Sequence, residues 1–154
     1  MRRLVVAFDM DDTLVTTDGR NLWLRPGARS LLAWLRPRGH EVRLWTSASR
    51  AWTAKVLAAY PDLARSFSRV DTREATGSVL KDAIRAGVDL LVDDLPAHRD
   101  FAVYARGPGV AGRYLILGGY RASSRGHPVE TEPRWADRVV DEILRREGLA
   151  STAA

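Results

Sequence analysis

The stretch that decides the fold is "LVVAFDMDDTLV", Leu4 to Val15, in which an apolar run ends abruptly in three carboxylates at Asp9, Asp11 and Asp12. A short apolar run of this kind is typical of a buried strand. Carboxylates this close together repel one another, and a partly buried carboxylate is costly unless something offsets its charge. The stretch therefore predicts a strand that ends in a site for a positively charged partner.

The composition is that of an ordinary soluble globular protein. The chain has 154 residues, of which 45% are hydrophobic and 28% charged. We expect one catalytic domain over residues 1–148 and a flexible tail at residues 149–154. No apolar run reaches the roughly 18–20 residues that span a membrane. The N-terminal run is too short for a signal peptide, so we expect a cytoplasmic protein with no membrane partner. Nothing in the sequence indicates the oligomeric state.

Several kinds of chemistry are excluded or disfavoured by residue type. The chain has no cysteine, which excludes disulfides, thiolate metal sites and cysteine nucleophiles. Its histidines, His40, His98 and His127, lack the spacing of a zinc site. The net charge of +5 would suit nucleic acid, but 22 of the 24 basic residues are Arg and they are spread along the chain. A nucleic-acid partner stays open but is not favoured, whereas anionic substrates are expected.

Short β-type runs alternate with helical patterns, which predicts an α/β fold. We expect a doubly wound, Rossmann-like parallel sheet of five strands with helices on both faces, because the strands are nearly continuous apolar runs. The expected strands are Leu4–Phe8, Glu41–Trp45, Phe67–Val70, Asp89–Val92 and Arg113–Leu117. The expected helices are one after Pro26 that carries Ala28, Leu31, Leu32 and Leu35 on its apolar side, and others at about 49–60, 78–86, from Pro96, and at about 134–147. The helix at about 49–60 has Trp52, Val56 and Ala59 on one side, and we expect Trp52 to lie in the core.

A small flap is expected just after the acidic cluster. In "LVTTDGRNLWLR" the pair Asp18-Gly19 lies between β-prone runs, as in a two-residue hairpin turn. Residues 106–134 are rich in Gly, Ser and Arg around a single strand.

Polar groups follow several of the predicted strands. They are Asp9 to Thr13, then Thr46 and Ser47, and finally Asp93 and Asp94, with Lys81 opening the helix before the last of these strands. Open parallel sheets bind ligands outside the carboxyl ends of their strands. Mg²⁺ prefers oxygen ligands and would hold the carboxylates together, while Lys81 and the hydroxyls would fit a phosphoryl group. The sequence therefore predicts a magnesium ion and a phosphate at this edge.

These four motifs, "DMDDTL", "VRLWTS", "LKDAI" and "LLVDD", resemble those of the haloacid dehalogenase superfamily of phosphotransferases. The segment "LRPGARSLLAWLRPRGHEVRLWTSAS" is similar to the RPG…WTS segment of its C-terminal-domain phosphatase-like branch. The resemblance covers about Leu4 to Pro96.

The resemblance implies a role for each motif residue. Asp9 would be the nucleophile that forms an aspartyl-phosphate. Asp11 would protonate the leaving oxygen and later activate water. Mg²⁺ would be held by the Asp9 side chain, the Asp11 backbone carbonyl and Asp94. The remaining roles are phosphate binding by Thr46, Ser47 and Lys81, support of the loop by Thr13, and steadying of Lys81 or of the metal's water shell by Asp93.

Other interpretations of the motifs fit less well. An EF-hand counted from Asp9 would have Leu14 and Arg20 where Gly and Glu are needed. "GPGVAG" has the GxGxxG pattern but precedes a strand, the reverse of a dinucleotide site. In a phospho-receiver domain the Lys follows the last motif strand, whereas here it precedes it. A catalytically silent binding module remains the other non-enzyme alternative.

The substrate is predicted from spacing. Only 32 residues separate Thr13 from Thr46 and 34 separate Thr46 from Lys81, too few for a cap domain of ordinary size. Without a cap, the substrate itself must exclude water, which favours a phosphoprotein or another large ligand. Polynucleotide ends, nucleotides and sugar phosphates remain alternatives. The flap, with Arg20 and Arg25, is expected to form part of the docking surface.

Overall fold

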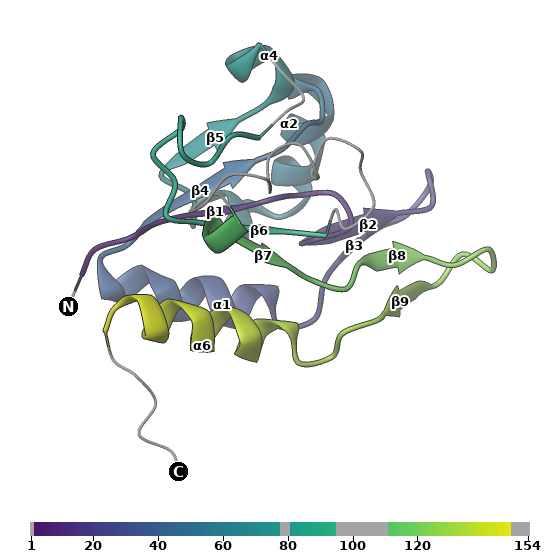
Figure 1. Cartoon of the computed structure of the whole chain (residues 1–154). Helices are drawn as coiled ribbons and strands as arrows, with labels where there is room; N and C mark the ends of the chain where they lie inside the picture. The colour runs from purple at the N-terminus through teal and green to yellow at the C-terminus, as the bar shows by residue number, and fades with distance from the viewer. Residues whose placement is uncertain (1, 78–80, 95–110, 149–154) are drawn as a thin grey trace.

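The computed structural model describes residues 2–77, 81–94 and 111–148. A five-stranded parallel sheet forms its centre, in the order β5-β4-β1-β6-β7 (Figure 1). The strands are β1 (Val5–Phe8), β4 (Glu41–Trp45), β5 (Arg69–Asp71), β6 (Leu90–Asp93) and β7 (Tyr114–Ile116). The chain moves from β1 outward to β5 and then returns to the other side of β1. This reversal is the doubly wound topology that the sequence predicted.

The described helices are α1 (Ala28–Leu35), α2 (Arg50–Ala59), α3 (Pro61–Ala64), α4 (Arg73–Thr76) and α6 (Trp135–Arg146), with 3₁₀ turns η1 (Arg36–Arg38) and η2 (Ala111–Arg113). None of the described helices is long and apolar enough to cross a lipid bilayer. The expected strand at 67–70 begins two residues later than predicted. The short helices α3 and α4 were not predicted. The expected helix from Pro96 and the C-terminal tail lie outside the described residues.

One face of the sheet carries the main hydrophobic core. Alternate strand residues such as Val6, Phe8 and Leu44 point to this face and are buried. They pack against α1, α2, α3 and α6, and Figure 1 shows α1 and α6 lying side by side along the sheet. All four apolar residues predicted for α1 are buried. In α2, by contrast, Ala59 is exposed and Thr53 takes the buried position with Val56.

The opposite face packs differently from the prediction. A smaller cluster there joins Ala7 and Leu91 of the sheet to Ala83 and Val88. The expected helix at 78–86 is wrong over its described part, because residues 81–82 have no regular structure and residues 83–87 form turns. Gly87, at φ 66°, ends the segment in the left-handed conformation before a helix can extend. Lys81 therefore comes to the sheet edge from an irregular segment before β6 rather than from a helix.

Two antiparallel hairpins stand at the carboxyl end of the sheet (Figure 1). The predicted flap is confirmed as β2 (Val15–Thr17) and β3 (Leu22–Leu24). Its loop has four residues rather than two, because the Asp18 carboxylate accepts hydrogen bonds from the Arg20 and Asn21 N–H groups and widens the turn. A second hairpin, β8 (Tyr120–Ala122) and β9 (Pro128–Glu130), was not predicted.

Arg25 joins the two hairpins to the core. Its side chain is fully buried, and it donates to both carboxylate oxygens of Glu130, at 2.7 and 2.5 Å. It also donates to the carbonyl oxygens of Thr13 and Gly118, and its guanidinium lies 4.7 Å from the ring centre of Trp135. The expectation that Arg25 lies on a docking surface is therefore wrong, because its side chain is fully buried and a substrate cannot reach it.

We expect Arg25→Ala to lower the free energy of unfolding by about 3–5 kcal/mol, because it leaves the Glu130 carboxylate without its partner. Urea unfolding followed by circular dichroism measures this loss. Arg29→Ala is the matched control, because Arg29 forms an ion pair with Asp62 but is 60% exposed. An equally small loss for both variants would contradict the role given to Arg25.

Candidate active site

The site lies where β1 and β6 end side by side. Phe8 pairs with Val92, so the residues that follow these two come to the same edge. Asp9, Asp93 and Asp94 are each less than 10% exposed. One carboxylate oxygen from each lies within 4.8 Å of the others. Strand pairing thus brings together two acidic motifs that are more than 80 positions apart in the chain.

Lys81 is the counter-charge of this group. Its ammonium lies 2.5 Å from Asp9 Oδ1 and 2.9 Å from Asp93 Oδ2. Burial alone would lower the pKa of Lys81, but the two carboxylates outweigh burial and raise it. Lys81 is therefore a fixed positive charge. The expectation that Asp93 steadies Lys81 agrees with this geometry.

Burial also changes the acidity of the carboxylates. It raises the pKa of Asp9 to about 8, against the opposing effect of Lys81 and with further repulsion from Asp93 and Asp94. Burial likewise raises the pKa of Asp93, again opposed by Lys81. The three buried carboxylates face two cations, Lys81 and the Arg121 guanidinium that contacts Asp94, so one negative charge is left unbalanced when all three are ionised. A further cation at this edge would relieve the repulsion.

The oxygen-only donor set fits a hard divalent cation. Asp9, Asp93 and Asp94 can each offer a carboxylate oxygen to one ion. No other group of three or more His, Cys, Asp or Glu in the described ranges could hold a metal. Asp9 and Asp94 are both predicted metal ligands. Asp93 is the third carboxylate here, while Asp11 was expected to contribute only its backbone carbonyl.

Thr13 ties the two acidic motifs together. Its hydroxyl oxygen lies 3.0 Å from Asp9 Oδ2 and 3.0 Å from Asp94 Oδ1, so its one hydrogen can serve either carboxylate. The loop that places it is tight: the N–H groups of Thr13 and Leu14 point to the Met10 carbonyl, and Asp12 has a φ of 60°. Asp12 therefore shapes the turn.

Asp11 lies beside this group and has a different partner. Its carboxylate accepts a hydrogen bond of 2.8 Å from the Trp52 indole N–H. Burial raises the pKa of Asp11, and the Trp52 hydrogen bond opposes the rise. Trp52 was predicted as a core residue, and the sequence offered one missed signal: a half-buried indole needs an acceptor, and Trp52 lies in the first turn of the helix after the Thr46 motif. It holds the Asp11 side chain away from the three-carboxylate group.

Thr46 follows β4, the neighbour of β1 on the other side. It is 2% exposed, and its N–H donates to the Asp71 carbonyl. Its hydroxyl oxygen accepts from the Ala48 N–H at 3.0 Å, and no acceptor in the described part of the chain takes its hydrogen, which can therefore serve a ligand. Ser47 comes next, half-buried at the same sheet edge. The order of the strands therefore brings all four motifs to one end of the sheet.

Arg121 is a charged residue of the site that sequence reasoning missed. It lies on β8 of the second hairpin, and its guanidinium donates to Asp94 Oδ2 at 3.1 Å. Its Nε lies 3.7 Å from Asp12 Oδ2. No motif marks Arg121, because its hairpin is not recognisable from the sequence pattern.

The sequence matches no protein-family model, and it matches no curated protein. Solved structures do share its fold. The structure described as Fcp1, an essential RNA polymerase II CTD phosphatase, matches with a TM-score of 0.59 and 17% identity, over 97% of this chain and 50% of that chain. A putative beta-phosphoglucomutase from Thermotoga maritima matches with a TM-score of 0.65 and 14% identity, over 92% of this chain and 100% of that chain.

A HAD-superfamily hydrolase of subfamily IA from Geobacter sulfurreducens matches with a TM-score of 0.55 and 13% identity, over 90% of this chain and 100% of that chain. The chain has the haloacid dehalogenase fold. The expected resemblance is thus confirmed at the level of the fold, and the chain spans half the length of the Fcp1 chain. No cap domain occupies the described part of the haloacid dehalogenase core between the motifs: residues 14–45 form the flap, α1, η1 and β4, and residues 47–77 form α2, α3, β5 and α4.

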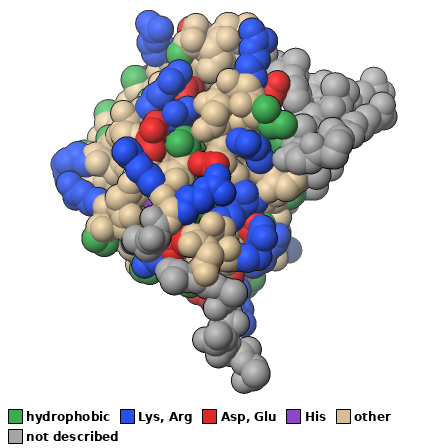
Figure 2. All heavy atoms as spheres, turned by 60° about the vertical axis from the view of Figure 1, so that its left-hand side comes forward, with side chains coloured by type: hydrophobic (Ala, Val, Ile, Leu, Met, Phe, Trp, Pro, Cys, Tyr) green, Lys and Arg blue, Asp and Glu red, His purple; other side chains and the backbone are tan. Residues whose placement is uncertain are grey.

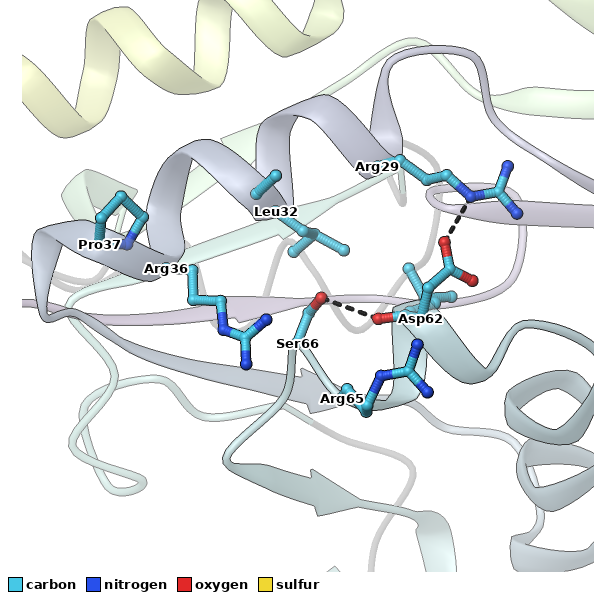
Figure 3. Close-up of a pocket in the computed structure, with 9 residues that line it drawn as sticks. Arg29, Leu32, Arg36, Pro37, Asp62, Arg65 and Ser66 are labelled. Carbon is cyan, nitrogen blue, oxygen red and sulfur yellow. Dashed lines mark hydrogen bonds and ion pairs between the residues drawn. The ribbon is translucent and has the colours of Figure 1, made fainter.

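A separate groove of about 420 Å³ lies between α1 and α3 (Figure 3). Arg29, Arg36 and Arg65 line it, and Arg29 is paired with Asp62. None of the four motifs contributes a residue to it. The groove therefore plays no part in the chemistry of the site.

Proposed function

We propose that this protein is a magnesium-dependent phosphomonoester hydrolase that works through an aspartyl-phosphate on Asp9, and that its substrate is a phosphoprotein. The observation that carries the proposal is the placing of Asp9 at the end of β1, in contact with Lys81 and beside Asp93 and Asp94. The fold shared with Fcp1 and the other haloacid dehalogenase structures supports it.

In the proposed first step, an Asp9 carboxylate oxygen attacks the phosphorus and the bond from phosphorus to the leaving oxygen breaks. Asp11 gives its proton to that oxygen, and its raised pKa suits an acid of this kind. Lys81 and the Thr46 hydroxyl would hold the phosphoryl oxygens. In the second step Asp11 takes a proton from water, which attacks the phosphorus and releases phosphate from Asp9.

Asp9, Asp94 and the Asp11 carbonyl would hold Mg²⁺, with Asp93 close by. When bound, the ion supplies positive charge to the phosphoryl oxygens and draws them into line with Asp9.

The choice of a large substrate rests on the open site. Because no cap is present between the motifs in the described residues, the substrate must itself exclude water. We expect kcat/KM for a phosphopeptide to exceed that for small sugar phosphates or mononucleotides by at least about tenfold. Steady-state kinetics over both substrate classes measures the ratio. Equal efficiency on a free sugar phosphate would refute the choice of a macromolecule but leave the hydrolase itself standing.

Nucleic acid is the second candidate substrate, favoured only by the net charge of +5. Figure 2 shows Lys and Arg side chains spread over one face of the molecule with acidic side chains among them. Among the described residues, the exposed large hydrophobic side chains are Val70, Ile84 and Val129, so this part of the surface offers no exposed aromatic platform for bases. These features favour a peptide.

A further inference from the structure

Arg121 reaches over the candidate active site from the side of solvent. Its side chain is 60% exposed, whereas the Asp94 side chain to which it donates is 3% exposed. Its other acidic neighbour, Asp12, is 41% exposed and lies beyond hydrogen-bond distance at 3.7 Å. The guanidinium therefore lies between the buried Asp94 carboxylate and solvent, while most of the Arg121 side chain remains exposed and can contact a ligand.

Backbone hydrogen bonds from the second hairpin to the loop after β1 and to the flap hold Arg121 in this place. The residues on either side of Arg121 are fixed to the first motif and to the flap: the Tyr120 N–H donates to the Asp12 carbonyl at 2.8 Å, and the Ala122 N–H donates to the Thr16 hydroxyl at 3.2 Å. Tyr120 points inward and is 4% exposed. Because neighbouring strand residues point to opposite sides, Arg121 points away from the interior that holds Tyr120, and its hydrogen bond to Asp94 Oδ2 places the guanidinium at the acidic site.

Gly119 leaves the space that Arg121 uses. A Cβ at this position would lie 2.8 Å from Arg121 Nε and 3.4 Å from Asp94 Oδ2. The first distance is shorter than real Cβ contacts allow, so a side chain at residue 119 would push the arginine away. Two backbone hydrogen bonds, from Tyr120 and Ala122, and the lack of a side chain at Gly119 thus fix the position of the Arg121 guanidinium.

We propose that Arg121 forms an anion subsite at the entrance, which binds an acidic side chain next to the phosphorylated residue of a peptide substrate. This rests on the proposed function. The Thr13 hydroxyl lies on Asp94 Oδ1, so a divalent cation would use Oδ2, the oxygen to which Arg121 donates, and Arg121 gives up that hydrogen bond when the cation binds. The planar guanidinium, already anchored beside the site, then offers paired N–H donors to a carboxylate of the substrate.

The test compares two phosphopeptides that differ only by Asp or Asn beside the phosphoserine. We expect wild-type kcat/KM to favour the Asp peptide by about tenfold, and the preference to fall with added salt. In Arg121→Gln the ratio should fall below about twofold. Gly119→Ala should lower it as well, since it displaces the guanidinium without removing its charge. Arg125→Gln is the matched control, because Arg125 lies in the loop of the same hairpin and is exposed.

Mg²⁺ titration by calorimetry gives a readout that does not depend on turnover. We expect Arg121→Gln to bind Mg²⁺ at least about threefold more tightly than the wild type, because the arginine no longer competes for Asp94. Unchanged Mg²⁺ affinity together with an unchanged peptide ratio would overturn the subsite and make Arg121 a structural partner of Asp94. An Arg121-dependent preference for a 3′-phosphorylated oligonucleotide over the Asp peptide would overturn the peptide assignment. If the wild type hydrolyses no phosphomonoester at all, the proposed function fails instead.

Discussion

Asp9→Asn is expected to lower kcat by at least about 10⁴-fold, because the amide has nearly the shape of the carboxylate but cannot attack phosphorus. The variant should fold, since the Lys81 ammonium can still donate to the amide oxygen and Thr13 remains beside it. Turnover of p-nitrophenyl phosphate, followed alongside far-ultraviolet circular dichroism, separates lost chemistry from lost structure.

Asp12→Asn is the matched control for the nucleophile. Asp12 belongs to the same loop and the same motif, but its carboxylate accepts from the Thr16 hydroxyl and is absent from the three-carboxylate group. Asn tolerates the left-handed conformation that Asp12 adopts. We expect kcat for Asp12→Asn to stay within about tenfold of the wild type. Near-normal turnover by Asp9→Asn would rule out Asp9 as the nucleophile.

Removal of divalent cations is expected to abolish turnover, with a loss of at least about 10²-fold in EDTA and recovery when Mg²⁺ is added back. The physical reason is the excess of negative charge when Asp9, Asp93 and Asp94 are all ionised, because only Lys81 and the exposed Arg121 face these three carboxylates. A phosphate dianion cannot approach this group until a cation balances it. Ca²⁺ should inhibit, because its larger and less regular shell disturbs the in-line geometry.

Thermal unfolding checks the metal site independently of catalysis. A cation at about 100 times its Kd stabilises the folded state by about 2.7 kcal/mol, and beryllium fluoride should add to the melting temperature only when Mg²⁺ is present. Asp94→Asn should remove most of the Mg²⁺-dependent shift. Full activity in chelator, or a shift that is the same in wild type and Asp94→Asn, would contradict the metal site.

The acidic edge was predictable because each motif is a short local sequence pattern, and the pairing of parallel strands brings the motifs together. The run from Leu4 to Phe8 is apolar and ends in Asp9, and "LLVDD" shows the same pattern before Asp94. Parallel pairing of β1 with β6 then joins the two ends without any further information. The apolar spacing of α1 was equally local, and all four of its predicted core residues are buried.

The second hairpin was not predictable in the same way. Its strands have three residues each, with Arg and Pro among them, so neither propensity nor alternation marks them. It is stabilised by distant partners: Ala122 donates to Thr16, and Glu130 pairs with Arg25. For the same reason Arg25 was expected on the surface, since its buried acceptors come from parts of the chain that the sequence does not place beside it. Arg121 was missed with the hairpin that carries it.

The most direct test of the account is to trap the covalent intermediate. In Asp11→Asn the second step should be slow, because no base remains to activate water. Quenching this variant with borohydride during turnover reduces an aspartyl-phosphate to homoserine, which mass spectrometry of the peptide containing Asp9 identifies. The account predicts homoserine at Asp9, dependent on substrate and Mg²⁺ and absent from Asp9→Asn. An unmodified Asp9 in a variant that still releases the leaving group, or label on another residue, would contradict it.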